Sequence, residues 1–358
     1  MARNREQAAA REHVTGQIVD IKRALEARGK CWLVTGVAGF IGSNLLEMLL
    51  KCDQRVVGMD NFSTGRRQNL YDVQQCVGPT RWANFTFLEC DTAQPTACAK
   101  ACAGVDYVLH QAALGSVPRS IADPQVVNQS NVTGFLNVLV AARDAKVKRF
   151  IYASSSAVYG DHQALQKVEH ATGRPLSPYA VTKCVNELYA EVFGKTYDME
   201  CIGLRYFNVF GRRQSPDGSY AAVIPLWVSN LLNGKPCMVN GDGKTTRDFC
   251  YVDNVLQANL LAALTDNRHA LNAVYNIAVG GQTSLIELYA MIRDRVVRVR
   301  PDLLVAEPNF GPFRSGDVRH SQADIAKARR LLGYKPSHTL AQGLDEAIPW
   351  FCSAFHPR

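Results

Sequence analysis

TGVAGFIGSN, residues 35–44, contains three glycines with the spacing G-x-x-G-x-x-G. The apolar run CWLV precedes it at 31–34, and FIGSNLLEMLLK follows at 40–51 with the apolar periodicity of a helix. A strand, a tight glycine turn and a helix in this order bring backbone N–H groups and the positive end of the helix dipole to a pyrophosphate. The stretch therefore predicts a dinucleotide site lined by Gly36, Gly39, Phe40, Ile41 and Gly42.

An acidic residue ends the second predicted strand, RVVGMD at 55–60. At this position the Asp60 carboxylate can accept hydrogen bonds from an adenosine ribose, although an acid here can also simply cap a turn. A carboxylate repels a 2′-phosphate, at a cost on the order of 4 kcal/mol for like charges about 4 Å apart near a surface. The sequence therefore favours NAD over NADP. Further residues expected to line NAD follow this strand and the next two: Asn61, Asp91, Gln111, Ala112 and Ala113.

Short apolar runs alternate with helical segments along most of the chain. After the first two strands they are FTFLE (85–89), DYVLH (106–110), RFIYAS (149–154), ECIGLRYF (200–207) and VYNIAV (274–279). This alternation predicts an α/β fold, a Rossmann-type doubly wound parallel sheet covered by helices on both faces.

The alternation breaks at 209–246, which is rich in Gly, Pro, Ser and Asn. We expect an NAD-binding domain from 31–208 and 247–284, and a smaller mixed α/β substrate-binding domain from 209–246 and 285–358. Residues 1–30 are expected to form an N-terminal helical arm, because apolar side chains recur at helical spacing at Val14, Ile18, Ile21 and Leu25.

Composition excludes several classes of function. The chain has no run of about 18 apolar residues and no apolar signal-peptide core, so no membrane span or export is expected. Eleven cysteines without C-x-x-C pairs indicate reduced thiols in the cytoplasm, and no metal-ligand spacing occurs. The net charge of +8 is dispersed, and its densest run, RDRVVRVRP at 293–301, is typical of a solvated helix face. Nucleic-acid binding is therefore not expected.

SPYAVTK, residues 177–183, places Tyr179 four residues before Lys183, on one face of a helix. Alone, this spacing arises easily by chance. ASSSAVYG at 153–160 adds serines at the end of a central strand, where open α/β sheets bind ligands. A phenol has a pKa of about 10, and a neighbouring ammonium and a nicotinamide cation would lower it toward that of a useful base. The expected catalytic residues are Ser155, Ser156, Tyr179 and Lys183, and the last two are also expected to contact NAD.

TGVAGFIGSN, Asp60, SSSAVYG, YAVTK and LRYFNVFG together resemble the extended short-chain dehydrogenase/reductase family, over residues 31 to about 350. GDGKTTRDFCYVDN and FRSGDVRHSQAD are typical of its nucleotide-sugar branch, and the strongest likeness is to bacterial UDP-N-acetylglucosamine 4-epimerases of O-antigen and capsule pathways. The resemblance implies NAD, a UDP-sugar substrate and a homodimer, often formed through a helical bundle. It also implies substrate contacts at Ser116, Asn208, Arg247, Arg314, Asp317 and Ser321. Val37 departs from the pattern, since glycine is common there in the epimerases.

The two residues before V-Y-G (158–160) narrow the choice of reaction type. Dehydratases of the family carry Asp-Glu and UDP-glucuronate decarboxylases carry Glu there, whereas this chain has Ser156 and Ala157. Epimerisation at C4 through a 4-keto sugar needs no such acid. A different class of function is also considered, that of a cofactor-binding regulator or scaffold that catalyses no reaction. The retained serine, tyrosine and lysine argue against it.

The expected substrates are UDP-GlcNAc and UDP-GalNAc, with UDP-GlcNAcA and UDP-glucose/UDP-galactose as alternatives. In the resembling epimerases a tyrosine seven residues after the pyrophosphate arginine accompanies restriction to UDP-glucose and UDP-galactose. Counted from Arg314, that position is Ser321, which leaves space for an acetamido group. The alternative role of this serine is a helix cap, because SQADIAKARR resembles a helix start.

Overall fold

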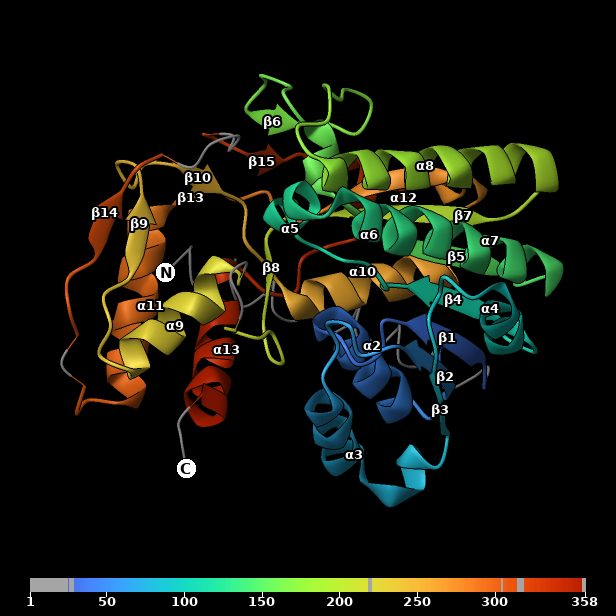
Figure 1. Cartoon of the computed structure of the whole chain (residues 1–358), viewed down its shortest axis with the longest axis horizontal. Helices are drawn as coiled ribbons and strands as arrows, with labels where there is room; N and C mark the ends of the chain where they lie inside the picture. Colours follow the sequence, from blue (N-terminus) through green and yellow to red (C-terminus); the bar gives the residue numbers. More distant parts are fainter. Residues whose placement is uncertain (1–24, 26–28, 218–220, 304, 314–318, 356–358) are drawn as a thin grey trace, which may run out of the picture.

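The computed structural model describes residues 25, 29–217, 221–303, 305–313 and 319–355 (Figure 1). A large α/β unit lies beside a smaller lobe of helices and short strands. Within the described ranges, no helix combines the length and the apolar character that crossing a bilayer requires.

The predicted strands form one seven-stranded parallel sheet in the order β12-β7-β5-β4-β1-β2-β3. Their bounds are β1 (Cys31–Thr35), β2 (Arg55–Asp60), β3 (Phe85–Glu89), β4 (Tyr107–His110), β5 (Arg149–Ser155), β7 (Cys201–Tyr206) and β12 (Ala273–Ile277). β1 pairs on one side with β2 and on the other with β4, so Thr35 lies level with both Met59 and His110. Strand order reverses here, and such a reversal opens a crevice at the carboxyl ends of the strands. The Rossmann-type doubly wound fold is confirmed.

Helices cover both faces of this sheet (Figure 1). Side chains alternate along β1, so Trp32 and Val34 enter one hydrophobic core and Leu33 enters the other. The first core is covered by α2 (Phe40–Lys51), α3 (Arg67–Trp82), α10 (Val252–Leu264) and α12 (Ala326–Leu332). The second is covered by α4 (Pro95–Cys102), α7 (Gly134–Asp144) and α8 (Pro178–Tyr197).

Two of these helices start in ways that matter for the cleft. α2 spans the predicted residues and follows the glycine turn directly. α8 begins at Pro178, which fits the first turn because proline lacks the N–H that would be unpaired there. The Ser177 hydroxyl accepts the N–H of Ala180 as an N-cap at 3.2 Å. Tyr179 is therefore held in the first turn of a well-capped helix.

The smaller lobe is assembled from separate parts of the chain. It contains α9 (Val223–Leu232), β9 (Met238–Asn240), α11 (Leu285–Val299), β14 (Asn309–Gly311) and α13 (Leu340–Phe355). The three helices pack on one another, and β9 pairs with β14 (Figure 1). The basic run at 293–301 lies mostly on α11, as expected of a helix face, with Arg295 paired to Asp345 of α13 at 2.8 Å.

Short strand pairs join distant segments between the two parts. They are β8 (Val209–Phe210) with β11 (Cys250–Tyr251), β10 (Thr246–Arg247) with β13 (Thr283–Ser284), and β6 (Gln166–Lys167) with β15 (Gln322–Ala323). After β15 the chain returns to the large sheet, where α12 packs against β12. Small elements complete the described chain: α5 (Val117–Ala122), α6 (Pro124–Asn128), a π-helical turn (Gln129–Thr133) and two 3₁₀ turns (Ser156–Tyr159 and Arg268–Ala270).

The predicted N-terminal arm falls almost wholly outside the described residues. Of its apolar stripe only Leu25 is described, and this side chain is helical and buried in the first core.

Candidate active site

A cleft lies at the carboxyl ends of the central strands, with one part of about 730 Å³ and a second of about 560 Å³. The two parts are continuous, because both are lined by Phe40, Ile41, Gln111 and Ala113. The predicted cofactor residues Gly36, Gly39, Gly42, Asp60, Asn61, Asp91 and Ala112 line the first part, as does Ser116. Ser155, Ser156, Tyr179, Lys183, Asn208, Arg247 and Ser321 line the second.

The glycine turn leaves no room for side chains. Gly36 has a φ of +67°, and a Cβ added to it would lie 2.9 Å from the main chain of Ala112. A Cβ on Gly42 would lie only 2.1 Å from the carbonyl oxygen of Gly36. Only glycine therefore lets β1, the turn and the start of α2 pack this closely, and the open cradle that results suits a pyrophosphate.

Asp60 fixes the loop beside this cradle. Its buried carboxylate accepts the N–H of Ala38 at 2.9 Å and that of Phe62 at 2.8 Å. Burial raises the pKa of Asp60, against the effect of these two hydrogen bonds. Each carboxylate oxygen retains a lone pair for a ribose hydroxyl. Nearby, the Asn61 amide donates to the Asp91 carboxylate at 2.7 Å. These acceptors and donors fit the adenosine half of NAD.

Gln111, where the two parts of the cleft meet, is held by two residues from other elements. Its carbonyl oxygen accepts from the Tyr206 hydroxyl at 3.1 Å, and its amide nitrogen donates to Asn259 at 3.1 Å. The Asn259 amide in turn donates to Tyr206 at 2.9 Å. The three side chains thus form a closed hydrogen-bond network that fixes the orientation of the Gln111 amide.

Tyr179 and Lys183 come together with the end of β5. The Lys183 ammonium lies 5.9 Å from the centroid of the Tyr179 ring and donates to the carbonyl oxygen of Ala153 at 2.8 Å. Burial lowers the pKa of Lys183 to about 8, although Glu187 opposes that shift. Burial raises the pKa of Tyr179, whereas a hydrogen bond with Ser155 lowers it. A phenol, a hydroxyl and a cation thus share one corner of the cleft.

Glu187, one turn after Lys183, anchors α8 to the sheet, and sequence reasoning missed it. Its carboxylate accepts two hydrogen bonds from Arg205 of β7, at 2.9 and 2.7 Å, and one from the Ser154 hydroxyl at 2.5 Å. The strand end that carries Ala153 and Ser155 is thereby fixed on both sides. The spacing of Lys183 and Glu187, four residues apart, was the available signal.

The predicted substrate residues are brought together only in part. The Asn208 amide donates to the carbonyl oxygen of Asp248 at 3.0 Å, and the Arg247 guanidinium donates to the carbonyl oxygen of Thr246 at 2.7 Å. The main-chain N–H of Ser321 donates to the same Thr246 oxygen at 3.3 Å, which places Ser321 on the wall of the cleft. Arg314 and Asp317 lie outside the described residues.

Ser321 does not cap a helix. α12 begins at Ala326, whose N–H is accepted by the Asp324 side chain at 2.8 Å, and Ser321 comes directly before β15. The cap alternative is therefore excluded.

The loop after β8 also lines the first part of the cleft, through Arg213, Gln214 and Ser215. Arg213 adopts a φ of 66°, which costs a residue with a Cβ on the order of 1 kcal/mol or more. Its buried guanidinium forms an ion pair with Glu47 of α2 and donates to Asn44 at 3.1 Å. These contacts hold the loop over the cofactor side of the cleft. Sequence reasoning missed this pair, because its members lie far apart in the chain.

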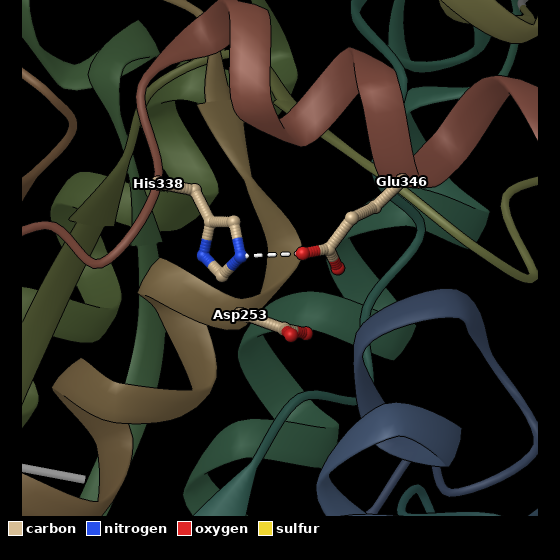
Figure 2. Close-up of side chains that lie close together, drawn as sticks. All are labelled: Asp253, His338 and Glu346. Carbon is tan, nitrogen blue, oxygen red and sulfur yellow. Dashed lines mark hydrogen bonds and ion pairs between the residues drawn. The ribbon is translucent and has the colours of Figure 1, made fainter. Parts of the chain in front are cut away.

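A group of titratable side chains outside the cleft has the proximity of metal ligands. Figure 2 shows Asp253, His338 and Glu346 close together. A ring nitrogen of His338 lies 2.9 Å from the Glu346 carboxylate. The Arg212 guanidinium forms an ion pair with Asp253 at 3.0 Å. Because this guanidinium already supplies a cation, the group fits a structural tie between the loop after β8, α10 and α13.

Comparisons with known proteins agree with this geometry. Residues 32–278 match the model of the NAD dependent epimerase/dehydratase family. The chain is 35% identical to a UDP-glucose 4-epimerase of Mycolicibacterium smegmatis over 321 residues, which cover 89% of this chain and 97% of the relative.

Two solved structures extend the comparison. A UDP-N-acetylglucosamine 4-epimerase from Methanobrevibacter ruminantium, in complex with UDP-N-acetylmuramic acid, is 36% identical with a TM-score of 0.82, and the match covers 91% of this chain and 99% of that one. A mutant UDP-glucuronic acid 4-epimerase from Bacillus cereus, in complex with UDP-4-deoxy-4-fluoro-glucuronic acid and NAD, is 31% identical with a TM-score of 0.79, covering 90% and 99%.

Proposed function

The chain belongs to the NAD dependent epimerase/dehydratase family, and from that premise we propose that it is a UDP-sugar 4-epimerase that interconverts UDP-GlcNAc and UDP-GalNAc. When bound, NAD would supply the reversible hydride transfer at C4 of the hexose that this reaction requires. The residues proposed to hold it are those of the glycine turn, Asp60, Asn61, Asp91 and Gln111 to Ala113.

Tyr179 is the proposed acid and base. Its phenolate would take the proton of the C4 hydroxyl when the 4-keto sugar forms, and would return it when the alcohol is restored. We propose that the Lys183 ammonium, 5.9 Å from the centroid of the Tyr179 ring, favours the phenolate during the reaction, because a positive charge nearby stabilises an anion. The Ser155 side chain lowers the pKa of Tyr179, and we propose that it orients the same substrate oxygen. Ser156 follows it at the start of the 3₁₀ turn and lines the same wall.

One observation favours epimerisation over elimination. Among the described residues that line the second part of the cleft, none is Asp or Glu. Elimination needs a carboxylic acid to protonate the departing hydroxyl, whereas epimerisation needs only the tyrosine and a 4-keto sugar that turns over. Firm anchoring of UDP, proposed for Arg247, Arg314 and Asp317, would leave the hexose free to turn.

Ser321 supports the choice of N-acetylated sugars. A serine on this wall occupies far less volume than a tyrosine, and Ser321 is committed to the cleft rather than to a helix cap. The space is proposed to accept the acetamido group while the 4-keto sugar turns over. Asn208 lies between β7 and β8 and has a φ of 34°. We propose that it also contacts the substrate.

The test is steady-state epimerisation over a panel of UDP-sugars, with Ser321→Tyr and Ser321→Ala compared. We expect turnover of UDP-GlcNAc in the wild type and a sharp loss of it in Ser321→Tyr, with a small change or a gain for UDP-glucose, because a packed wall relaxes only partly around added volume. Ser321→Ala should keep the preference. Equal responses of both sugars to the tyrosine would refute the assignment to N-acetylated substrates.

A homodimer is part of the proposal. Exposed apolar side chains form a stripe on α8, at Val181, Leu188 and Val192, which are 48%, 61% and 52% exposed. Ile121 of α5 and Val126 of α6 extend this surface, at 65% and 52%. A second copy that packs its α8 here would bury them in a helical bundle.

The proposal also includes the cellular location of the protein and the roles of its two domains. All eleven cysteines are free thiols, which supports work in the reducing cytoplasm, where the product would serve polysaccharide assembly. We propose an NAD-binding domain of residues 31–208 and 247–284 and a substrate-binding domain of residues 209–246 and 285–358. Asn208 and Arg247 of the first domain would reach the substrate, and α12 of the second packs on the large sheet.

A further inference from the structure

The second part of the cleft contains a buried cation with no assigned role. Lys167, on β6, is 2% exposed and lines this part of the cleft together with Tyr179 and Ser321. Its ammonium donates to the carbonyl oxygen of His162 at 2.5 Å. An ammonium has three N–H donors, so two remain for other acceptors.

The charge of Lys167 lacks a carboxylate partner in the part of the chain that the structure describes. The other buried lysine of the cleft, Lys183, has Glu187 as a charge partner. Burial alone lowers the pKa of Lys167, in keeping with an ammonium that no anion compensates. A buried cation of this kind gains most from an acceptor oxygen that enters with a ligand.

The main chain of Lys167 is fixed. Its carbonyl oxygen accepts from the Asn276 amide at 2.8 Å and from the N–H of Asp324 at 2.9 Å. β6 pairs with β15 so that Lys167 lies opposite Ala323, and the N–H of Gln322 donates to the carbonyl oxygen of Leu165 at 3.2 Å. Ser321 comes two residues before Ala323, and it lines the same part of the cleft as Lys167. The ammonium therefore belongs to the wall where the extra substituent of the hexose is proposed to lie.

We propose that Lys167 is a specificity-determining residue, whose ammonium donates to an acceptor oxygen that glucose lacks. That oxygen is the carbonyl of a C2 acetamido group or a C6 carboxylate. The inference rests on the proposed function, since it requires a UDP-hexose in this cleft.

The experiment measures kcat/KM for UDP-GlcNAc, UDP-glucuronic acid and UDP-glucose in the NAD-loaded enzyme and in Lys167→Met. Loss of a hydrogen bond to a charged donor should lower kcat/KM for the recognised sugar by roughly tenfold or more, and that for UDP-glucose by less than about threefold. Loss with UDP-GlcNAc identifies the acetamido carbonyl, and loss with UDP-glucuronic acid identifies the C6 carboxylate. Lys167→Arg keeps the charge and should keep the preference.

Lys327→Met is the matched control. The Lys327 ammonium also donates to a main-chain carbonyl oxygen, that of Val274 at 2.9 Å, but Lys327 does not line either part of the cleft. Lys327→Met should therefore leave the ratio of kcat/KM values between the sugars unchanged. If Lys167→Met does not retain NAD, Lys167→Gln makes the same comparison with a neutral polar side chain.

The outcomes separate this inference from the function on which it rests. An equal loss of kcat/KM with all three sugars, together with an equal loss of affinity for UDP, would place Lys167 at the diphosphate. That result would overturn this inference but not the proposed function. An unchanged ratio in Lys167→Met and Lys167→Gln would overturn it as well. A wild-type enzyme that epimerises none of the three would overturn both.

Discussion

Glu47→Gln tests whether the buried ion pair between α2 and the loop after β8 supports the cofactor side of the cleft. The Glu47 side chain is 8% exposed and that of Arg213 is 2% exposed. Burial by itself would raise the pKa of Glu47, but the guanidinium of Arg213 and hydrogen bonds from Arg213 and Lys51 lower it from 4.5 to about 2. Removal of the carboxylate charge would leave a buried guanidinium without its counterion.

The cost follows from this shift in pKa. The fall of the pKa from 4.5 to about 2 corresponds to about 3 kcal/mol of folding free energy, within the range of roughly 3–5 kcal/mol for breaking a buried ion pair. Lys51→Met is the control, because Lys51 pairs with the same carboxylate but its side chain is 46% exposed. That variant should lose less than about 1 kcal/mol. Urea denaturation of both variants measures the difference.

The pH dependence provides a second check. The folded-state pKa of Glu47 is below its unfolded value, so its stabilisation is complete above about pH 4.5 and is lost as the pH falls toward 2. The gap in unfolding free energy between wild type and Glu47→Gln should therefore narrow below pH 4.5. Arg213 lines the NAD side of the cleft, so the variant should also retain less NAD after gel filtration. Equal losses of unfolding free energy in Glu47→Gln and Lys51→Met would refute the reasoning. So would a difference in unfolding free energy between wild type and Glu47→Gln that does not change with pH.

Four other substitutions probe separate parts of the molecule. Tyr179→Phe should retain NAD and lose at least about a hundredfold in kcat, and near-normal turnover would remove Tyr179 as acid and base. Gly42→Ala should lose bound NAD and melt at a lower temperature, because its Cβ would collide with the turn; a variant with normal NAD content would contradict this. Leu188→Glu should shift the sedimentation coefficient from that of a dimer to that of a monomer, whereas an unchanged value would exclude the α8 surface as the interface. Burial raises the pKa of Asp248 from 3.8 to about 6, so wild type should gain about 1 kcal/mol of stability between pH 7 and pH 5. Asp248→Asn should lack that gain, which urea denaturation at pH 7 and pH 5 measures.

The large sheet could be predicted from sequence because its signals are local. Each strand is a short apolar run, and α2 follows a glycine turn whose spacing suits one structure. The π-helical turn before α7 and the helix α9 were not foreseen. α9 lies within 209–246, where Gly, Pro, Ser and Asn around VIPLWVSNLL obscure its periodicity.

The part of the site that escaped prediction depends on contacts between distant residues. Lys167 stands in the polar stretch DHQALQKVEH and reads as a surface lysine, because only the pairing with β15 buries it. Glu47 interrupts an apolar helix and meets its partner 166 residues later. No local pattern encodes either contact. Ser321 was predicted from its family position, but only the observed start of α12 at Ala326 excludes a helix cap, and only the lining of the cleft places Ser321 on its wall.

The return of the chain to the large sheet after β15 has a consequence for biosynthesis. α12 covers β12, the edge strand whose Tyr275 and Ile277 are fully buried, and it comes about fifty residues later in the chain, after α11 and β14. During translation, the emerging sheet therefore keeps an uncovered apolar edge until the ribosome has delivered most of the smaller lobe. Such an edge is prone to aggregation, and contacts of long sequence separation form slowly. The large unit cannot reach its final form before most of the smaller lobe has been made, so a nascent chain halted within α11 would expose apolar surface to chaperones and proteases rather than present a finished nucleotide-binding unit.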